Sequence, residues 1–246
     1  MANNFFPTRQ SLNVIYFTGL ILSGMVLVQG CSTASRQASV PQVVEDKITR
    51  LTADVQVTEV APSDETKNAR KTLDGILKKY DLEPFLFSHN IRIESGVIPA
   101  HLPSITLNSD DAEDANYFLS TLLHQEFHWY VIANTKNTDA AVADLKKLYP
   151  EVPKGLRNGG TKSAESTYQH LIICWLEFQA DKYYLGQTAG EKLMKEMTFF
   201  NWIYETVVRD EHKIAEIVQK HSLLPSTEPK KSALGEAGKT TKTKTT

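Results

Sequence analysis

Two histidines four residues apart, His124 and His128, have the clearest capacity for metal chemistry in this sequence. They lie in an apolar stretch, residues 118–131, whose pattern predicts a helix. At 3.6 residues per turn the two side chains lie about 40° apart around the helix axis and one turn apart along it. One helix can thereby offer two imidazole nitrogens to a tetrahedral Zn²⁺. The pair alone is a weak signal, because a chain with seven histidines can contain one by chance.

A second apolar stretch, residues 174–186, carries two carboxylates one helical turn apart, Glu177 and Asp181. Both lie on one face of the helix that this stretch predicts. A carboxylate in so apolar a stretch is costly to bury unless a cation or hydrogen-bond donors face it. A metal ion would meet that need, so the second stretch strengthens the case for a metal site.

Together the two stretches resemble the gluzincin peptidases, in which an H-E-x-x-H helix supplies two zinc ligands and a later helix supplies a glutamate. In the prenyl-protein endopeptidase type that glutamate lies in E-x-x-A-D, followed by Leu-Gly. Here Glu177 and Asp181 occupy the E and D positions, and Leu185 and Gly186 follow. The resemblance covers about residues 104–186.

The resemblance implies a set of roles for these residues. His124, His128 and Glu177 would hold one Zn²⁺ per chain, and Asp181 would orient a ligating histidine through its other ring nitrogen. Residues 104–108, before the first histidine, would form an edge strand that pairs with an extended peptide. The partner implied is therefore a peptide or protein.

The first motif departs from H-E-x-x-H at the general base. Gln125 directly follows the first histidine, and Glu126 comes one position later. A glutamine cannot accept a proton at neutral pH, and a regular helix turns Glu126 about 200° away from His124. A π-bulge could rotate Glu126 toward a metal-bound water, which makes Glu126 the candidate catalytic base. The unbroken apolar pattern of the helix favours the regular geometry.

The sequence also suggests roles for three residues outside these two motifs. His170 precedes Glu177 by seven residues on about the same face, and it could be an alternative ligand, a donor to a ligand or a hydrogen-bonded core histidine. Cys174, a single cysteine among apolar residues, is expected to act as a small buried hydrophobe. For His101, near the end of a strand, a solvated or capping role is expected.

The N-terminal sequence predicts export and a lipid anchor. The apolar run at residues 14–28 is shorter than the roughly 20 residues that span a bilayer, and it is typical of a signal peptide. Residues 28–31, Val-Gln-Gly-Cys, resemble a bacterial lipobox, which implies acylation of Cys31. Ser32 after it implies sorting to the outer membrane, facing the periplasm. The alternative is an ordinary signal anchor with an incidental cysteine.

Composition and the lipobox resemblance together predict four segments. They are a signal peptide at 1–30, the lipidated cysteine with a tether at 31–62, one domain at 63–224 and a disordered tail at 225–246. The tether could hold one strand near residues 55–60.

Within the domain, the sequence predicts a small sheet and then helices only. Strands are expected at 85–94 and 105–108, and helices at 64–80 (capped by Ser63), 110–134, 139–148, 163–185 and, in one broken piece or two, 188–223. This order predicts an α+β domain, and the resemblance makes it zincin-like.

The charge balance and the motifs leave three hypotheses. With 27 basic and 29 acidic side chains the net charge is -2, which gives no basic field for nucleic acid. The first hypothesis is a membrane-anchored, zinc-dependent peptidase-like protein of the cell envelope that hydrolyses peptide bonds with metal-activated water. The second is a degenerate zincin that binds peptide or envelope partners without turnover. The third is a helical structural lipoprotein whose histidine pair is coincidental.

Overall fold

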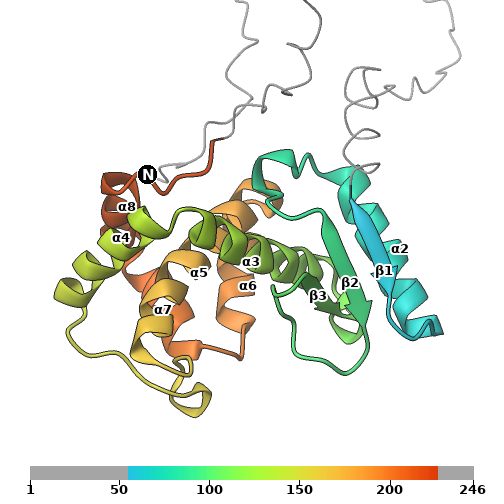
Figure 1. The fold of residues 1–246 in the computed structure, drawn as a ribbon, viewed down its shortest axis with the longest axis horizontal. Helices are drawn as coiled ribbons and strands as arrows, with labels where there is room; N and C mark the ends of the chain where they lie inside the picture. The colour runs from blue at the N-terminus through green and yellow to red at the C-terminus, as the bar shows by residue number, and fades with distance from the viewer. Residues whose placement is uncertain (1–54, 227–246) are drawn as a thin grey trace, which may run out of the picture.

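The computed structural model describes residues 55–226 (Figure 1). Cys31, the predicted signal peptide, most of the predicted tether and nearly all of the predicted tail lie outside the described residues. Between residues 55 and 226, none of the helices combines the length and the apolar character needed to cross a membrane.

A parallel sheet of three short strands lies at one end of the domain (Figure 1). The strands are β1 (Gln56–Glu59), β2 (Asn90–Glu94) and β3 (Ile105–Asn108), in that spatial order. In β2 and β3 every second side chain is buried, and Ile91 pairs with Ile105 across the two strands. Because β1 belongs to this sheet, the domain begins before residue 63, where the sequence placed its boundary.

Helix α2 (Asp64–Lys79) begins where the sequence predicted it. The backbone N–H of Thr66 donates to the Ser63 side chain, and the backbone N–H of Ser63 donates to the Thr66 hydroxyl. These reciprocal bonds satisfy two amides that the first turn leaves without partners. The buried face of the helix includes Ala69 and Leu73 and packs against the sheet.

Helices α3 (Ala115–Ala133) and α5 (Ala164–Leu185) form the centre of the domain. Figure 1 shows α3 lying between the sheet with α2 on one side and the other helices on the other. Helix α5 is buried over most of its length, and Trp175 and Phe178 on it are among the largest fully buried side chains. The two helices pack closely against each other, so side chains between them are shielded from water.

The remaining elements complete an α+β domain with seven α-helices among the described residues. The α+β class is the one that the sequence predicted. They are the 3₁₀ turns η2 (Glu83–Phe85), η3 (Ser109–Glu113) and η4 (Leu156–Asn158) and the helices α4 (Thr135–Leu148), α6 (Gln187–Glu196), α7 (Asn201–Arg209) and α8 (Glu211–Lys220).

Three predicted boundaries were wrong for local reasons. The helix expected from residue 110 begins at Ala115, because Asp114 caps it by accepting the N–H groups of Asn116 and Tyr117. The strand expected at 85–94 is confined to β2, because the residues before it form η2 and an irregular segment. The helical region after Gly186 divides into three helices.

Candidate metal centre

Three histidines meet between α3 and α5. His124 and His128 lie one turn apart on α3, with ring centroids 5.0 Å apart. His170 on α5 lies 5.7 Å from the first ring and 4.9 Å from the second. One ring nitrogen from each lies within 4.8 Å of the other two, so this group could hold a metal ion. The pair predicted on α3 is thus joined by the histidine that the sequence left with three alternative roles.

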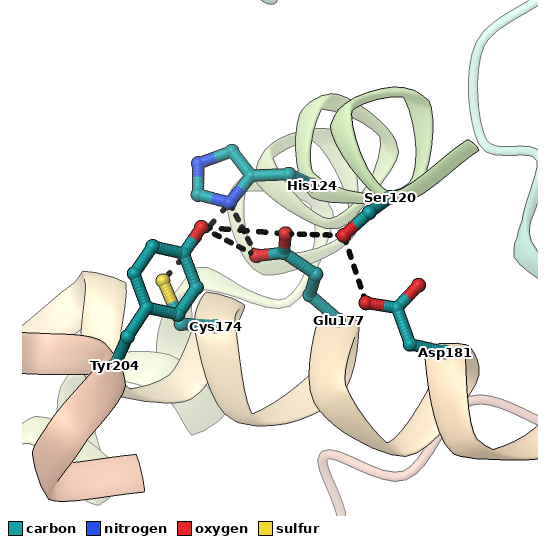
Figure 2. A network of polar contacts seen from close by, with 6 residues as sticks. All are labelled: Ser120, His124, Cys174, Glu177, Asp181 and Tyr204. Atoms are coloured by element: carbon teal, nitrogen blue, oxygen red, sulfur yellow. Dashed lines mark hydrogen bonds and ion pairs between the residues drawn. The ribbon is translucent and has the colours of Figure 1, made fainter. Parts of the chain in front are cut away.

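The hydrogen bonds of these rings leave the nitrogens that a metal needs. Nδ1 of His124 is 2.7 Å from Oε2 of Glu177, and Figure 2 shows its other ring nitrogen pointing away from that carboxylate. Nδ1 of His170 donates to the carbonyl of Ser166 at 2.8 Å. A neutral imidazole that donates from Nδ1 carries its lone pair on Nε2, which is the atom that binds metal. The donor set therefore fits a divalent cation.

Burial keeps two of these imidazoles neutral. Removal from water lowers the pKa of His128 far below its ordinary value, and the neighbouring His124 adds to the effect. The same two causes lower the pKa of His170 to about 3. Neutral imidazole is the form that coordinates a metal, so protons do not compete for these sites near neutral pH.

Glu177 lies behind His124 and is fully buried. Besides the bond to His124, its carboxylate accepts hydrogen bonds from Ser120 at 2.8 Å and from the hydroxyl of Tyr204 at 3.0 Å (Figure 2). Burial raises the pKa of Tyr204, so its phenol keeps the proton that it donates. In this arrangement Glu177 is a hydrogen-bond partner that orients His124, and the ligand role that the resemblance implied for Glu177 stays a prediction.

Cys174 lies beside the same pair, with Sγ 4.0 Å from Nδ1 of His124. Its sulfur, the histidine and Glu177 form a second group of atoms within 4.8 Å of one another. Burial raises the pKa of the Cys174 thiol, which favours the neutral thiol. This second group could also hold a metal ion, and Cys174 is the small buried residue that the sequence predicted.

Asp181 contacts Ser120 and none of the three histidines that group together. The Ser120 hydroxyl oxygen is 2.8 Å from an oxygen of Glu177 and 2.8 Å from an oxygen of Asp181. One hydroxyl has one hydrogen to donate, so one of the two carboxyl groups must supply the second proton. Burial, and then the Glu177 charge, raise the pKa of Asp181 well above its usual range. Asp181 is therefore the protonated member, and Glu177 takes the histidine-orienting place that the resemblance gave to Asp181.

Glu126 lies away from the three histidines. Its side chain is fully buried, and Oε2 accepts the backbone N–H groups of Phe87 at 2.7 Å and Ser88 at 2.9 Å. Burial raises its pKa to about 8 in spite of these two bonds. Helix α3 is α-helical throughout, as the apolar pattern favoured, and contains no π-bulge. Glu126 thus fixes the segment that leads into β2, and the structure does not bring it to the place of a catalytic base.

A cavity of about 1400 Å³ opens onto the three histidines. Gln125, the residue in the place of the usual general base, lines it beside them. His101 lines it too, with its ring stacked 3.9 Å from that of His128, and burial is the largest of the causes that lower its pKa. The sequence led us to expect a solvated or capping role for His101, and its position in the cavity wall differs from that expectation.

The cavity side of β3 is already paired. The N–H of Thr106 donates to the carbonyl of Ala100 at 2.7 Å, and the N–H of Ala100 donates back at 3.0 Å. The loop between β2 and β3 therefore covers the strand edge where the resemblance implied pairing with a peptide. A peptide bound in the cavity has to make its contacts elsewhere.

Sequence reasoning missed Tyr204 and Phe200 as parts of this site. Tyr204 reaches Glu177 from α7, and the Phe200 ring lies 4.9 Å from that of His170. Both come from the start of α7, and no spacing within the sequence connects them with the histidines. The only signal was that aromatic residues gather in this region of the chain.

No protein-family model matches this chain, and no characterised protein or solved structure matches it.

Proposed function

We propose that this chain is a zincin-like, lipid-anchored protein of the bacterial cell envelope that binds one Zn²⁺ and holds peptide in its cavity without efficient hydrolysis. The ligands are His124, His128 and His170. The observation that carries this proposal is the different placing of Gln125 and Glu126: the glutamine that lines the cavity cannot take a proton, and the carboxyl group of Glu126 is held by backbone amides elsewhere.

Zn²⁺ is the ion that this donor set suits best. Three neutral imidazoles are typical ligands of zinc sites that keep a position open for a further molecule. Bound there, the ion would supply a Lewis-acid centre for an oxygen of the peptide. The carboxylate of Glu177 provides the negative charge behind His124 that strengthens such a ligand.

The chain's own residues would do the rest of the binding. Ser120 and Tyr204 hold Glu177, and Glu177 fixes the orientation of the His124 ring. The side-chain amide of Gln125 can donate to and accept from a peptide backbone, and it lines the cavity. These roles give a rigid, preorganised centre beside an open volume.

Zinc-dependent peptide hydrolysis is the second candidate function. The observation in its favour is that the three histidines face an open cavity, where water and substrate can enter. His124, His128 and His170 would hold the ion, which would supply Lewis-acid activation of water and of the peptide carbonyl. A carboxylate other than Glu126 would have to accept the proton.

Metal analysis of the full-length protein, purified without chelator, tests the proposal. We expect about one Zn²⁺ per chain, its loss in His170→Ala, and retention with about 10- to 100-fold weaker affinity in Glu177→Gln. His89→Ala is the matched control, because His89 is exposed and lies outside the cavity. Full metal content in His170→Ala combined with its loss in Glu177→Gln would instead support the ligand set His124, His128 and Glu177.

The lipid anchor is tested separately. Mass spectrometry of the mature protein should find an acylated Cys31 at its N-terminus, and Cys31→Ser should move the protein to the aqueous envelope fraction. An unmodified residue 31 in the wild type would refute the anchor and leave the metal centre unaffected.

A further inference from the structure

Large apolar side chains gather around the mouth of the cavity. The described residues have seven such side chains that are exposed, and four of them line this cavity. These are Ile98 (74% exposed), Leu156 (53%), Phe199 (50%) and Ile132 (46%). They come from four separate segments of the chain, so no single loop explains their convergence. An exposed apolar patch around a cavity marks a binding surface for an apolar ligand.

The cavity follows one face of α3 for most of its length. Tyr117, Thr121, His124, His128 and Ile132 all line it, at the three- and four-residue intervals of a helical face. The 15 steps from the first of these to the last correspond to about 22 Å along the axis. An extended chain rises about 3.3 Å per residue, so this length accommodates about six residues of peptide. A small molecule would fill only part of it.

The two ends of the cavity can be told apart because α3 and α5 run antiparallel. Ser120 contacts Asp181, while further along α3 the ring of His128 lies beside that of His170. The start of α5 therefore lies toward the end of α3. Lys162, directly before α5, is close enough to lower the pKa of His101, whose ring stacks on His128.

Two cations, Arg157 and Lys162, line the cavity from the segment that precedes α5, and α5 starts at the end of the cavity near Ile132. Both are exposed, and neither has an ion pair with another described residue. Of the cavity carboxylates near them, Glu165 is already paired with Lys146 at 2.6 Å, and Asp139 is the other. Two unpaired cations against one free carboxylate leave a positive charge at this end. A ligand that binds here should carry a negative charge at the matching position.

We propose that the cavity binds an extended, apolar peptide of about six residues whose carboxylate-bearing end lies at Arg157 and Lys162. This inference rests on the proposed function, and it specifies the ligand of that same site. The apolar side chains of the peptide cover the exposed side chains of the rim, and its backbone passes the three histidines. The peptide lies along the side chains of α3, since Ala100 already occupies the edge of β3.

Isothermal titration of the zinc-loaded, full-length protein in lipid nanodiscs tests this proposal. The probes are an acetylated hexapeptide of Leu, Ile and Phe residues with a free terminal carboxylate and the same peptide as its amide. We expect the free acid to bind about three- to ten-fold more tightly at low salt, and the preference to vanish in Arg157→Gln/Lys162→Gln. Equal binding of acid and amide to the wild type would overturn the proposed orientation.

A second arm tests the apolar rim. Leu156→Ser/Phe199→Ser should weaken both peptides by about ten-fold, because each side chain loses apolar contact with the ligand. Leu148→Ser is the matched control, since Leu148 is also exposed but lies outside the cavity, and it should bind like the wild type. Equal loss in the control variant would overturn the rim as the docking surface.

Two measurements on the same samples keep the explanations apart. Decanoate that displaces the free-acid peptide at an equal concentration would overturn a peptide in favour of a single-chain amphiphile. Zinc content separates this inference from the proposed function: normal zinc with no peptide binding refutes only the inference. If the protein takes up no zinc, the same titration is run on it as purified, and peptide binding with the expected acid preference then refutes only the metal centre.

Discussion

Two buried carboxylates, Glu126 and Glu177, lie on opposite sides of α3 and receive hydrogen bonds from different kinds of donor. Glu126 accepts two backbone N–H groups, from Phe87 and Ser88. Glu177 accepts bonds from side chains only, and one of these is the imidazole of His124. Both are glutamates in apolar helices, and the sequence alone assigned chemistry to both of them.

The kind of donor decides what each carboxylate can do. A backbone amide has no second nitrogen to offer to a ligand, so the two bonds that Glu126 accepts hold the segment at Phe87 and Ser88 in place. An imidazole has two nitrogens, so the charge of Glu177 is transmitted through His124 to whatever the other nitrogen binds. In this domain the partner of a buried carboxylate indicates its role better than the motif in which the carboxylate lies.

The largest effect expected from this comparison is a gain of activity in Gln125→Glu. The substitution puts a carboxylate in the cavity beside the histidines while Glu126 keeps its structural place. A positioned base contributes about 10² to 10⁴ in rate, so hydrolysis of a peptide substrate by the zinc-loaded protein should rise by that factor. Glu126→Gln should leave the slow wild-type rate unchanged.

One pattern of results would reverse the assignment. If the wild type hydrolyses peptide rapidly, and loses this activity in Glu126→Gln but keeps it in Gln125→Ala, Glu126 is the base after all. The carboxylate would then have to leave the amides of Phe87 and Ser88 in the active state.

The next effect concerns the stability of the fold. Glu126→Ala leaves the N–H groups of Phe87 and Ser88 without an acceptor, which should cost about 2 to 3 kcal/mol in the free energy of unfolding. Glu126→Gln keeps a carbonyl oxygen in the same place and should cost less than about 1 kcal/mol. Urea denaturation measures both, and zinc content should be normal in each. Loss of zinc in the folded Glu126→Gln protein would contradict a purely structural role.

The sequence predicted the parts of this site that depend on helical spacing. The interval of four residues put His124 and His128 on one face, and the apolar context put Glu177 against the same centre. The spacing could not say which nitrogen of an imidazole faces the carboxylate, because that depends on how α5 packs against α3. For this reason the sequence could not decide between Glu177 and His170 as the third member of the group.

In the fold as well, the sequence predicted what depends on neighbouring residues and missed contacts between distant segments. Ser63 marked the start of α2 because a capping serine acts within four residues, and the bounds of β3 followed from a short apolar alternation between prolines and aspartates. His101 and Tyr204 were missed because they reach the site only through a folded-back loop and a distant helix. Capping and periodicity rules use only neighbouring residues, whereas the contacts of His101 and Tyr204 join segments that are far apart in the sequence.

A smaller effect is expected in the network behind His124. Ser120→Ala removes the hydroxyl between Glu177 and Asp181, which should cost about 1 to 2 kcal/mol in the free energy of unfolding and weaken zinc binding about ten-fold. Asp181→Asn should be close to neutral in both measurements, because an amide N–H can donate to Ser120 as the protonated acid does. A loss in Asp181→Asn as large as in Ser120→Ala would mean that Asp181 is ionised.

The smallest effect is expected at a partly buried carboxylate near the surface, Asp144, which serves as the reference for both fully buried ones. Hydrogen bonds from Lys147, Lys220 and His221 hold the pKa of Asp144 below its ordinary value of 3.8. A lowered pKa means that the ionised group favours the folded state, and that this contribution is lost as the pH falls below about 3.8. Asp144→Asn should therefore lower the melting temperature at neutral pH, by less than either buried substitution. The difference between wild type and variant should shrink as the solution is acidified through that range.

A matched control separates this cluster from ordinary surface pairs. Among the described residues Glu196 has a single ion-pair partner, Lys192, at 3.6 Å on the surface of α6, and Glu196→Gln should leave the melting temperature unchanged at every pH. If Asp144→Asn behaves in the same way, three converging donors on the surface contribute no more than one. The contrast between the fully buried carboxylates and Asp144 would then depend on burial alone, and the kind of donor would matter only where water is excluded.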